Sequence, residues 1–168
     1  MANTYTLIEA KTIGTAVASV TFTSIPQTYT DLLLRVSARN SAGSTGIQIE
    51  FNASATGYTN RRLFGDGSGV TSDAPGLNYI SNTMIDDSGY TASTFGNGDI
   101  YIPNYTSSNY KSVSIDGVTE NNATGALSMF TAGLWSNTAA ITAVKLTAES
   151  AGNFVINSTF YLYGISNS

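Results

Sequence analysis

The clearest strand signal in the sequence is the stretch Ile25-Pro26-Gln27-Thr28-Tyr29-Thr30-Asp31-Leu32-Leu33-Leu34-Arg35-Val36-Ser37-Ala38-Arg39. Pro26 fixes its own φ angle and disfavours the helical region at Ile25, so the chain turns before the strand begins. From Asp31 on, apolar residues occupy one phase and polar residues the other, and Leu33 alone breaks the alternation. A period of two is typical of a strand with one buried face. We therefore predict a half-buried strand over residues 31–39.

Similar strand signals recur along the rest of the chain. They cover residues 16–22, 47–52, 99–102, 110–116, 126–135, 140–147 and 153–165. The segment 126–135 carries apolar residues in both phases, which predicts a central strand covered on both faces. Helical periodicity is absent, and turn signals recur at about the 8 to 12 residue spacing of sandwiches and barrels. The sequence predicts an all-β fold, a two-sheet antiparallel β-sandwich of the jelly-roll type with little or no helix. Immunoglobulin-like topology is the alternative.

The length of 168 residues fits one domain. We predict that residues 1–15 form an extended N-terminal arm or an edge strand, and that residues 16–168 form a single β-sandwich domain. Between about 65 and 96 the alternation is lost and glycine- and aspartate-rich turns follow one another. Compact domains rarely contain so long a loop without structure. This irregular insertion is therefore predicted to contain short strands or to serve a function, with residues 77–85 as the best candidate for a strand.

The composition favours a subunit of a larger assembly. Only 11% of the residues are charged, against about 25% in typical soluble domains, while 42% are hydrophobic. Serine, threonine, asparagine and glycine must therefore supply most of the polar surface. Such a surface solubilises a free monomer poorly but is common where a protein is packed among neighbours.

Charge and residue types exclude several function classes. The net charge is −4, and the seven basic residues are scattered apart from Arg61-Arg62, so we expect no nucleic acid partner. Histidine and cysteine are absent, which removes disulfides, thiolate nucleophiles and the usual zinc and iron ligands. No apolar run approaches the ~20 residues of a membrane helix, so we expect no membrane partner. The first residues lack the basic and apolar regions of a cleaved signal.

The acidic residues do not form a recognisable catalytic or metal-binding pattern. A glycoside-active enzyme, the third alternative for function, needs two carboxylates roughly 5 to 10 Å apart across a sugar. Asp86-Asp87-Ser88-Gly89 together with Asp66 could supply oxygens for calcium, but the spacing matches no EF-hand and these residues favour turns. We therefore predict no enzyme, and no catalytic, cofactor-binding or metal-binding residue. Four acidic residues follow the phase expected to face solvent: Asp31, Glu50, Asp99 and Asp116.

The candidate interaction residues are mainly tyrosines, of which the chain has ten. A tyrosine ring gives a large, fairly rigid contact area and can stack on a sugar or on a protein neighbour. For each single tyrosine, capping the end of the core is the alternative. The residues predicted to contact another protein are Tyr5, Leu7, Arg61, Arg62, Tyr79, Tyr90 and Tyr105.

Several motifs spread over nearly the whole chain carry a family resemblance. They are Ser24-Ile25-Pro26, Tyr29-Thr30-Asp31-Leu32 with Arg35, residues 100–105 with Tyr110-Lys111, Gly133-Leu134-Trp135 before Ala140-Ile141, and residues 160–165. Taken together, the chain resembles a group of small virion proteins encoded by tailed bacteriophages. The resemblance implies a jelly-roll subunit, commonly trimeric, that acts as a capsid cement (decoration) protein or as part of a tail or head fibre. The motifs describe strand starts and core positions, and no catalytic residue is carried over.

The resemblance and the composition lead to one expected function and one alternative. We expect a non-enzymatic virion structural protein, a homotrimer that binds and stabilises the major capsid protein shell on the capsid surface and is assembled in the host cytoplasm. The arm at residues 1–12 could add a strand to a neighbour's sheet edge. The alternative is a carbohydrate- or receptor-binding module of a fibre, with a glycan held by loop tyrosines and the insertion at 65–96.

Overall fold

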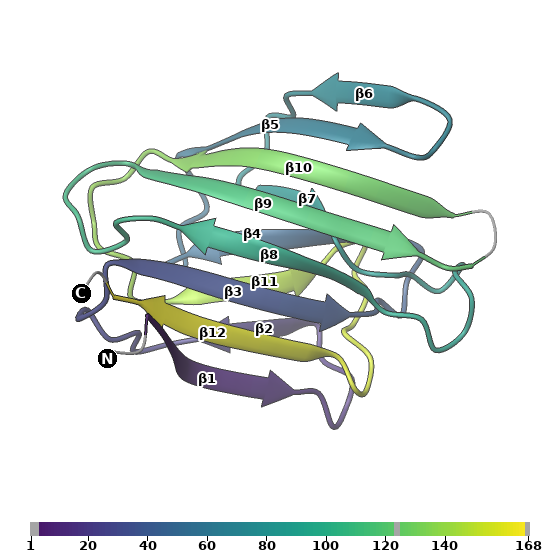
Figure 1. Ribbon diagram of the computed structural model, residues 1–168, viewed down its shortest axis with the longest axis horizontal. Helices are drawn as coiled ribbons and strands as arrows, with labels where there is room; N and C mark the ends of the chain where they lie inside the picture. The colour runs from purple at the N-terminus through teal and green to yellow at the C-terminus, as the bar shows by residue number, and fades with distance from the viewer. Residues whose placement is uncertain (1–3, 123–124, 167–168) are drawn as a thin grey trace.

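The computed structural model describes residues 4–122 and 125–166, which form two packed antiparallel sheets (Figure 1). The large sheet has eight strands in the order β1-β12-β3-β8-β9-β10-β5-β6, and the small sheet has four in the order β2-β11-β4-β7. The described residues contain no helix, and therefore none long and apolar enough to cross a membrane. The predicted all-β sandwich is confirmed, whereas its jelly-roll type stays a prediction. The strands are β1 (Tyr5–Thr12), β2 (Ser19–Phe22), β3 (Asp31–Ala38), β4 (Gly46–Phe51), β5 (Tyr58–Gly65), β6 (Val70–Asp73), β7 (Ile80–Thr83), β8 (Gly96–Ile102), β9 (Lys111–Glu120), β10 (Ala126–Trp135), β11 (Val144–Ala148) and β12 (Thr159–Ile165).

Strand β3 lies inside the large sheet, between β12 and β8. Its residues Leu32, Leu34 and Val36 are buried against the small sheet, while Arg35 is exposed on the other side. The predicted half-buried strand is therefore confirmed. Alternation of this kind separates the large sheet into an inner face, which packs on the small sheet, and an outer face, which does not.

An aromatic cluster closes one end of the space between the sheets. The ring of Trp135 packs against Phe51 at 5.7 Å and Tyr58 at 6.3 Å between centroids. The Tyr58 hydroxyl accepts a hydrogen bond from the Phe51 amide at 2.8 Å, and burial raises the pKa of Tyr58 to about 12. These contacts join β4 of the small sheet to β5 and β10 of the large sheet.

The insertion at residues 65–96 completes the sandwich. It contributes β6, an edge strand of the large sheet, and β7, an edge strand of the small sheet (Figure 1). Strand β7 lies under the inner face of the large sheet, where glycines allow its close approach. A Cβ atom at Gly117 would lie 2.3 Å from the Asn82 Oδ1 atom, and one at Gly133 would lie 2.8 Å from Ile80. Only glycine fits at these two positions.

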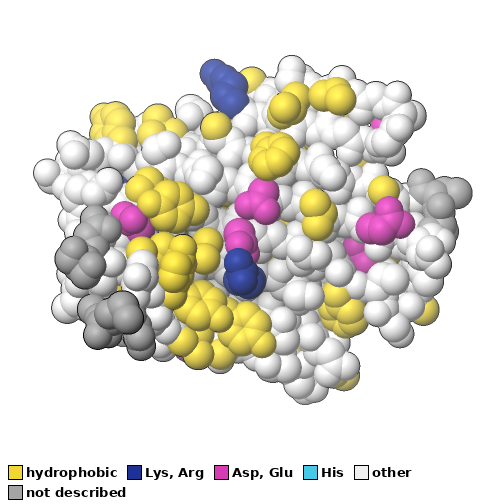
Figure 2. Space-filling view, viewed as in Figure 1, with side chains coloured by type: hydrophobic (Ala, Val, Ile, Leu, Met, Phe, Trp, Pro, Cys, Tyr) yellow, Lys and Arg dark blue, Asp and Glu magenta, His cyan; other side chains and the backbone are white. Residues whose placement is uncertain are grey.

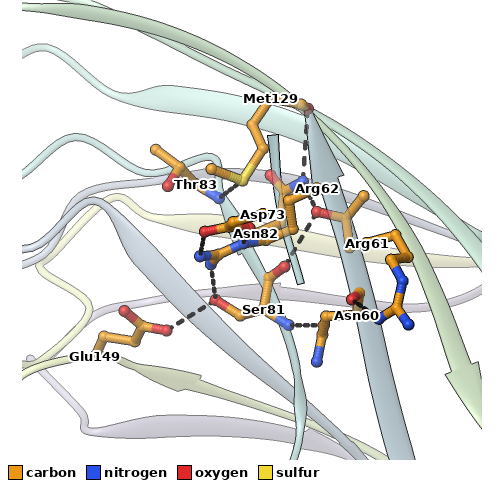
Figure 3. A network of polar contacts seen from close by, with 10 residues as sticks. Asn60, Arg61, Arg62, Asp73, Ser81, Asn82, Thr83, Met129 and Glu149 are labelled. Atoms are coloured by element: carbon orange, nitrogen blue, oxygen red, sulfur yellow. Dashed lines mark hydrogen bonds and ion pairs between the residues drawn. The ribbon is translucent and has the colours of Figure 1, made fainter. Parts of the chain in front are cut away.

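Polar side chains bond β7 to the large sheet and to the residue that follows β11 of the small sheet (Figure 3). The buried Asn60 side chain accepts a hydrogen bond from the Ser81 amide at 3.0 Å and donates one to the Tyr79 carbonyl at 3.0 Å. The Ser81 hydroxyl donates to Glu149 at 3.0 Å, and the Asn82 amide donates to the Thr131 hydroxyl at 2.9 Å. This network explains why Ser81 and Asn82 of β7 are buried although both are polar.

Three strand predictions need correction. Strand β10 is covered on one face only, because Phe130 in its outward phase is 63% exposed. The segment 140–147 becomes a strand only at Val144, since residues 140–143 form a loop in which Ile141 alone is buried. The final strand begins at Thr159, because the chain before it is irregular and Asn157 has a positive φ of 73°.

Candidate functional site

The outer face of the large sheet is the candidate functional surface. Figure 2 looks onto this face: hydrophobic side chains gather at the lower left, charged side chains lie near the centre, and further hydrophobic side chains are spread over the upper and right parts. The residues involved share the outward phase of their strands. Because neighbouring strands lie about 4.8 Å apart, outward residues that are paired across strands form continuous rows over the sheet.

The first group, called here the tyrosine patch, covers the β1 side of the outer face. The pairing places Leu7 opposite Tyr163, Tyr163 opposite Leu33, and Leu33 opposite Tyr101. The rings of Tyr161 and Tyr163 lie side by side, 6.5 Å apart between centroids and tilted by 31°. The members of the patch are Tyr5, Leu7, Leu33, Tyr101, Tyr161 and Tyr163.

The charged band in the middle of the outer face consists of Arg35, Asp99 and Asp116. Arg35 is paired with Asp99 across β3 and β8, and Asp99 with Asp116 across β8 and β9. The Arg35 guanidinium donates to both Asp99 oxygens, from Nε at 2.9 Å and from Nη2 at 2.7 Å, which raises the pKa of Arg35. Among the described residues, Asp116 has no ion-pair partner. Desolvation by the neighbouring groups of the sheet, together with the charge of Asp99, raises the pKa of Asp116, although its side chain is exposed.

The second hydrophobic group, called here the Phe130 patch, covers the β6 side of the outer face. Phe130 is paired with Asp116 on one side and with Leu63 on the other, so the patch borders the charged band. Val118 and Val70 lie at the two ends of the next row across the sheet. Between them the row contains Ser128 of β10 and Gly65 of β5. The members are exposed by 63% at Phe130, 49% at Leu63, 76% at Val70 and 40% at Val118.

Two hollows lie on the β1 side of the outer face and share Arg35. One, of about 390 Å³, is lined by the charged band together with Ser37, Asn97, Thr159 and Tyr161. The other, of about 360 Å³, is lined by Tyr5, Leu33, Arg35 and Tyr163. The two hollows therefore adjoin at one arginine, with tyrosine rings on both sides of it.

The structure places some of the predicted contact residues on the outer face and others away from it. Tyr5 and Leu7 lie on the exposed edge strand β1 and belong to the tyrosine patch. Arg61 lies on the outer face, in a hollow of about 530 Å³ that it shares with Phe130. Arg62 points to the inner side, where it forms an ion pair with Asp73 at 2.5 Å. This pair joins β5 to β6, so the role of Arg62 is structural.

The loop tyrosines do not form a common surface. Tyr105 is completely buried and its hydroxyl donates to the Pro26 carbonyl, so its prediction as a contact residue is wrong. Tyr90 is half-buried, with its hydroxyl within hydrogen-bond distance of the Thr119 hydroxyl at 3.3 Å. Tyr79 is half-buried as well, and burial raises its pKa. Of the three rings, only Tyr105 belongs to the buried core, and the contact roles of Tyr79 and Tyr90 stay predictions.

Asp31 corrects the prediction that all four acidic strand residues face solvent. It lies in the outward phase but is only 8% exposed. Its carboxylate accepts hydrogen bonds from the Tyr101 hydroxyl and from the Asn104 amide, both at 2.8 Å. The bond to Asp31 raises the pKa of Tyr101. Asp31 thereby fixes the Tyr101 ring at the margin of the tyrosine patch.

The acidic residues considered above for calcium binding do not come together in one site. The Asp66 carboxylate accepts hydrogen bonds from the Ser68 amide and hydroxyl and from the Gly69 amide, which lowers its pKa to about 2. Asp86 is fully buried, and this burial raises its pKa. In the part of the chain that the structure describes, no three acidic side chains converge in a way that could hold a metal ion.

Sequence reasoning missed several residues of the outer face. Leu33, Tyr101, Tyr163 and Phe130 were not among the predicted contacts. The signal that could have found them is an apolar residue in the outward phase of a strand, as Leu33 shows by breaking its alternation. Comparison with known proteins adds no further guide, since no family model and no curated protein matches this chain.

Proposed function

We propose that the chain is a non-enzymatic structural subunit of a phage virion, a trimeric cement protein that binds the major capsid protein on the capsid surface. The observation that carries this proposal is the Phe130 patch, where large apolar side chains lie exposed together on an unpartnered sheet face. Contiguous apolar patches on soluble proteins mark contact surfaces. The motif resemblance to phage virion proteins is the reason for proposing a phage capsid as the assembly.

The Phe130 patch suits a permanent contact between subunits. Permanent interfaces are more apolar than transient ones, and all four members of this patch are uncharged. Val70 lies on β6, whose free edge can also pair with a neighbouring chain. We assign the patch to the contact between copies of the trimer, which leaves other surfaces of each copy for the capsid. Three copies then bind the shell at once, so weak single contacts gain from multivalency.

Reconstruction of the phage particle tests the proposal. We expect density for the chain on the outside of the capsid shell in groups of three, and we expect the variant Phe130→Lys to lose most of this density. Ser112→Lys is the matched control, because Ser112 is exposed on the same face outside the patch. A wild-type particle whose shell carries no copy of the chain would contradict the proposal.

A further inference from the structure

The β1 side of the outer face differs from the Phe130 patch because it combines tyrosine rings with charged groups around the two hollows that share Arg35. We propose that this side binds a neutral oligosaccharide, whose sugar rings stack on Tyr161 and Tyr163 and whose hydroxyls bond Arg35, Asp99 and Asp116. The inference goes beyond the proposed function, because it concerns another surface and another class of partner.

The shape of the surface fits a chain of sugar rings. Each hollow, about 390 and about 360 Å³, lies near the lower end of the range for small-molecule sites, and the two adjoin at Arg35. Tyr161 and Tyr163 project from the same strand with their rings 6.5 Å apart and tilted by 31°. They form a nearly continuous aromatic strip, on which the apolar faces of successive sugar rings can lie.

The polar groups beside this strip are arranged for hydroxyl recognition. The two hydrogen bonds to Asp99 hold the planar Arg35 group in place before any ligand arrives, which lowers the ordering cost of binding. Each Asp99 oxygen accepts one bond from Arg35 and retains a further lone pair. Asp116 is exposed and has no ion-pair partner among the described residues, so its oxygens can accept bonds from sugar hydroxyls.

The local charge selects a neutral ligand. One arginine against two aspartates gives the band a net charge of −1, on a chain whose overall charge is −4. Phosphates, uronic acids and nucleic acids would meet this negative field and lose affinity. A purely apolar partner would strip water from the Arg35–Asp99 pair and from Asp116 without replacing their hydrogen bonds. Neutral sugars avoid both costs.

Titration of the full chain with defined hexasaccharides tests the inference, with binding followed by calorimetry and by two-dimensional NMR. The neutral probes are maltohexaose, cellohexaose, chitohexaose and mannohexaose, and hexagalacturonic acid is the charged probe. We expect at least one neutral probe to bind below about 10 mM and to shift the signals of β12 and β8, and we expect the charged probe to bind more weakly.

Variants locate the site. Tyr163→Ala should weaken binding about tenfold, while Tyr163→Phe, which keeps the ring, should change it by less than about twofold. Asp116→Ala, at an exposed position that carries little risk to folding, should also weaken binding. Val70→Lys, which changes the Phe130 patch at a position that is not paired with Asp116, should leave binding unchanged, so a failure of the proposed trimer contact is distinguishable from a failure of sugar binding. The inference is overturned if no neutral probe binds, or if binding survives both Tyr163→Ala and Asp116→Ala.

Discussion

The two faces of the large sheet are made by the same strands, yet they differ in what their side chains contact. On the inner face even a single methyl group has no room at Gly117, where a Cβ atom would lie 2.3 Å from Asn82. On the outer face Phe130 and Val70 are 63% and 76% exposed. Stability is therefore concentrated on one face, and the other carries apolar residues that the described part of the chain leaves exposed. Such residues point to contacts outside the molecule.

The largest effect on stability is expected for Gly117→Val. The new side chain would collide with Asn82 and with the Thr83 backbone, which cannot move without disturbing β7. We expect a loss of about 3 kcal/mol or more in the free energy of unfolding, measured by chemical denaturation. The control is Ser114→Val on the outer face of the same strand, which should change stability by less than about 0.5 kcal/mol. Equal losses in the two variants would remove the distinction between the faces.

A smaller loss is expected for Asn60→Ala on the inner face. This change removes the side chain that bonds both the Ser81 amide and the Tyr79 carbonyl, leaving buried groups unpaired. We expect a loss of about 2 kcal/mol in thermal and chemical denaturation. Thr59→Ala, at the exposed neighbouring position of β5, should have a much smaller effect. A tolerated Asn60→Ala would mean that β7 does not depend on this network.

Phe130→Lys should change the stability of the subunit by less than about 1 kcal/mol, because the ring is exposed and the new ammonium lies opposite Asp116. Thermal denaturation at a concentration low enough to keep the subunits apart measures this effect. A large loss there would show that Phe130 supports the fold, which would undermine its assignment to an external contact.

The smallest effect concerns pH and Asp116. A raised pKa means that the folded chain holds this proton more tightly than the unfolded chain, so the associated stability is present below the unfolded pKa and is lost as the pH rises through the folded pKa. Asparagine cannot deprotonate, so Asp116→Asn removes this loss of stability at higher pH. We expect the variant to gain stability relative to the wild type as the pH rises above the ordinary aspartate pKa of about 4, by less than about 1 kcal/mol because solvent screens the exposed group. Denaturation curves with the same pH dependence in both proteins would contradict this.

The inner face could be predicted well from the sequence because burial leaves a period of two. Leu32, Leu34 and Val36 alternate as expected and are buried. Segment 126–135 was wrongly predicted to be covered on both faces. An apolar residue in the outward phase gives the same sequence pattern whether another layer covers it or it remains exposed. Phe130 is the exposed case.

The candidate surface could be predicted only in part. Tyr5 and Leu7 lie in the tyrosine patch, but its rows depend on strand order and register, which join β1, β12, β3 and β8 from distant parts of the chain. Tyr105 was misplaced because a loop position says nothing about whether the ring turns inward. The polar residues of β7 showed no period, since their burial depends on partners such as Asn60 and Glu149.

Sedimentation velocity of the wild-type chain and of Phe130→Lys would decide whether the outer face joins subunits. We predict that the wild type sediments as a trimer at micromolar concentration and that Phe130→Lys sediments as a folded monomer, while Ser112→Lys remains a trimer. A wild type that stays monomeric, or a Phe130→Lys variant that still forms trimers, would contradict the assignment of the Phe130 patch.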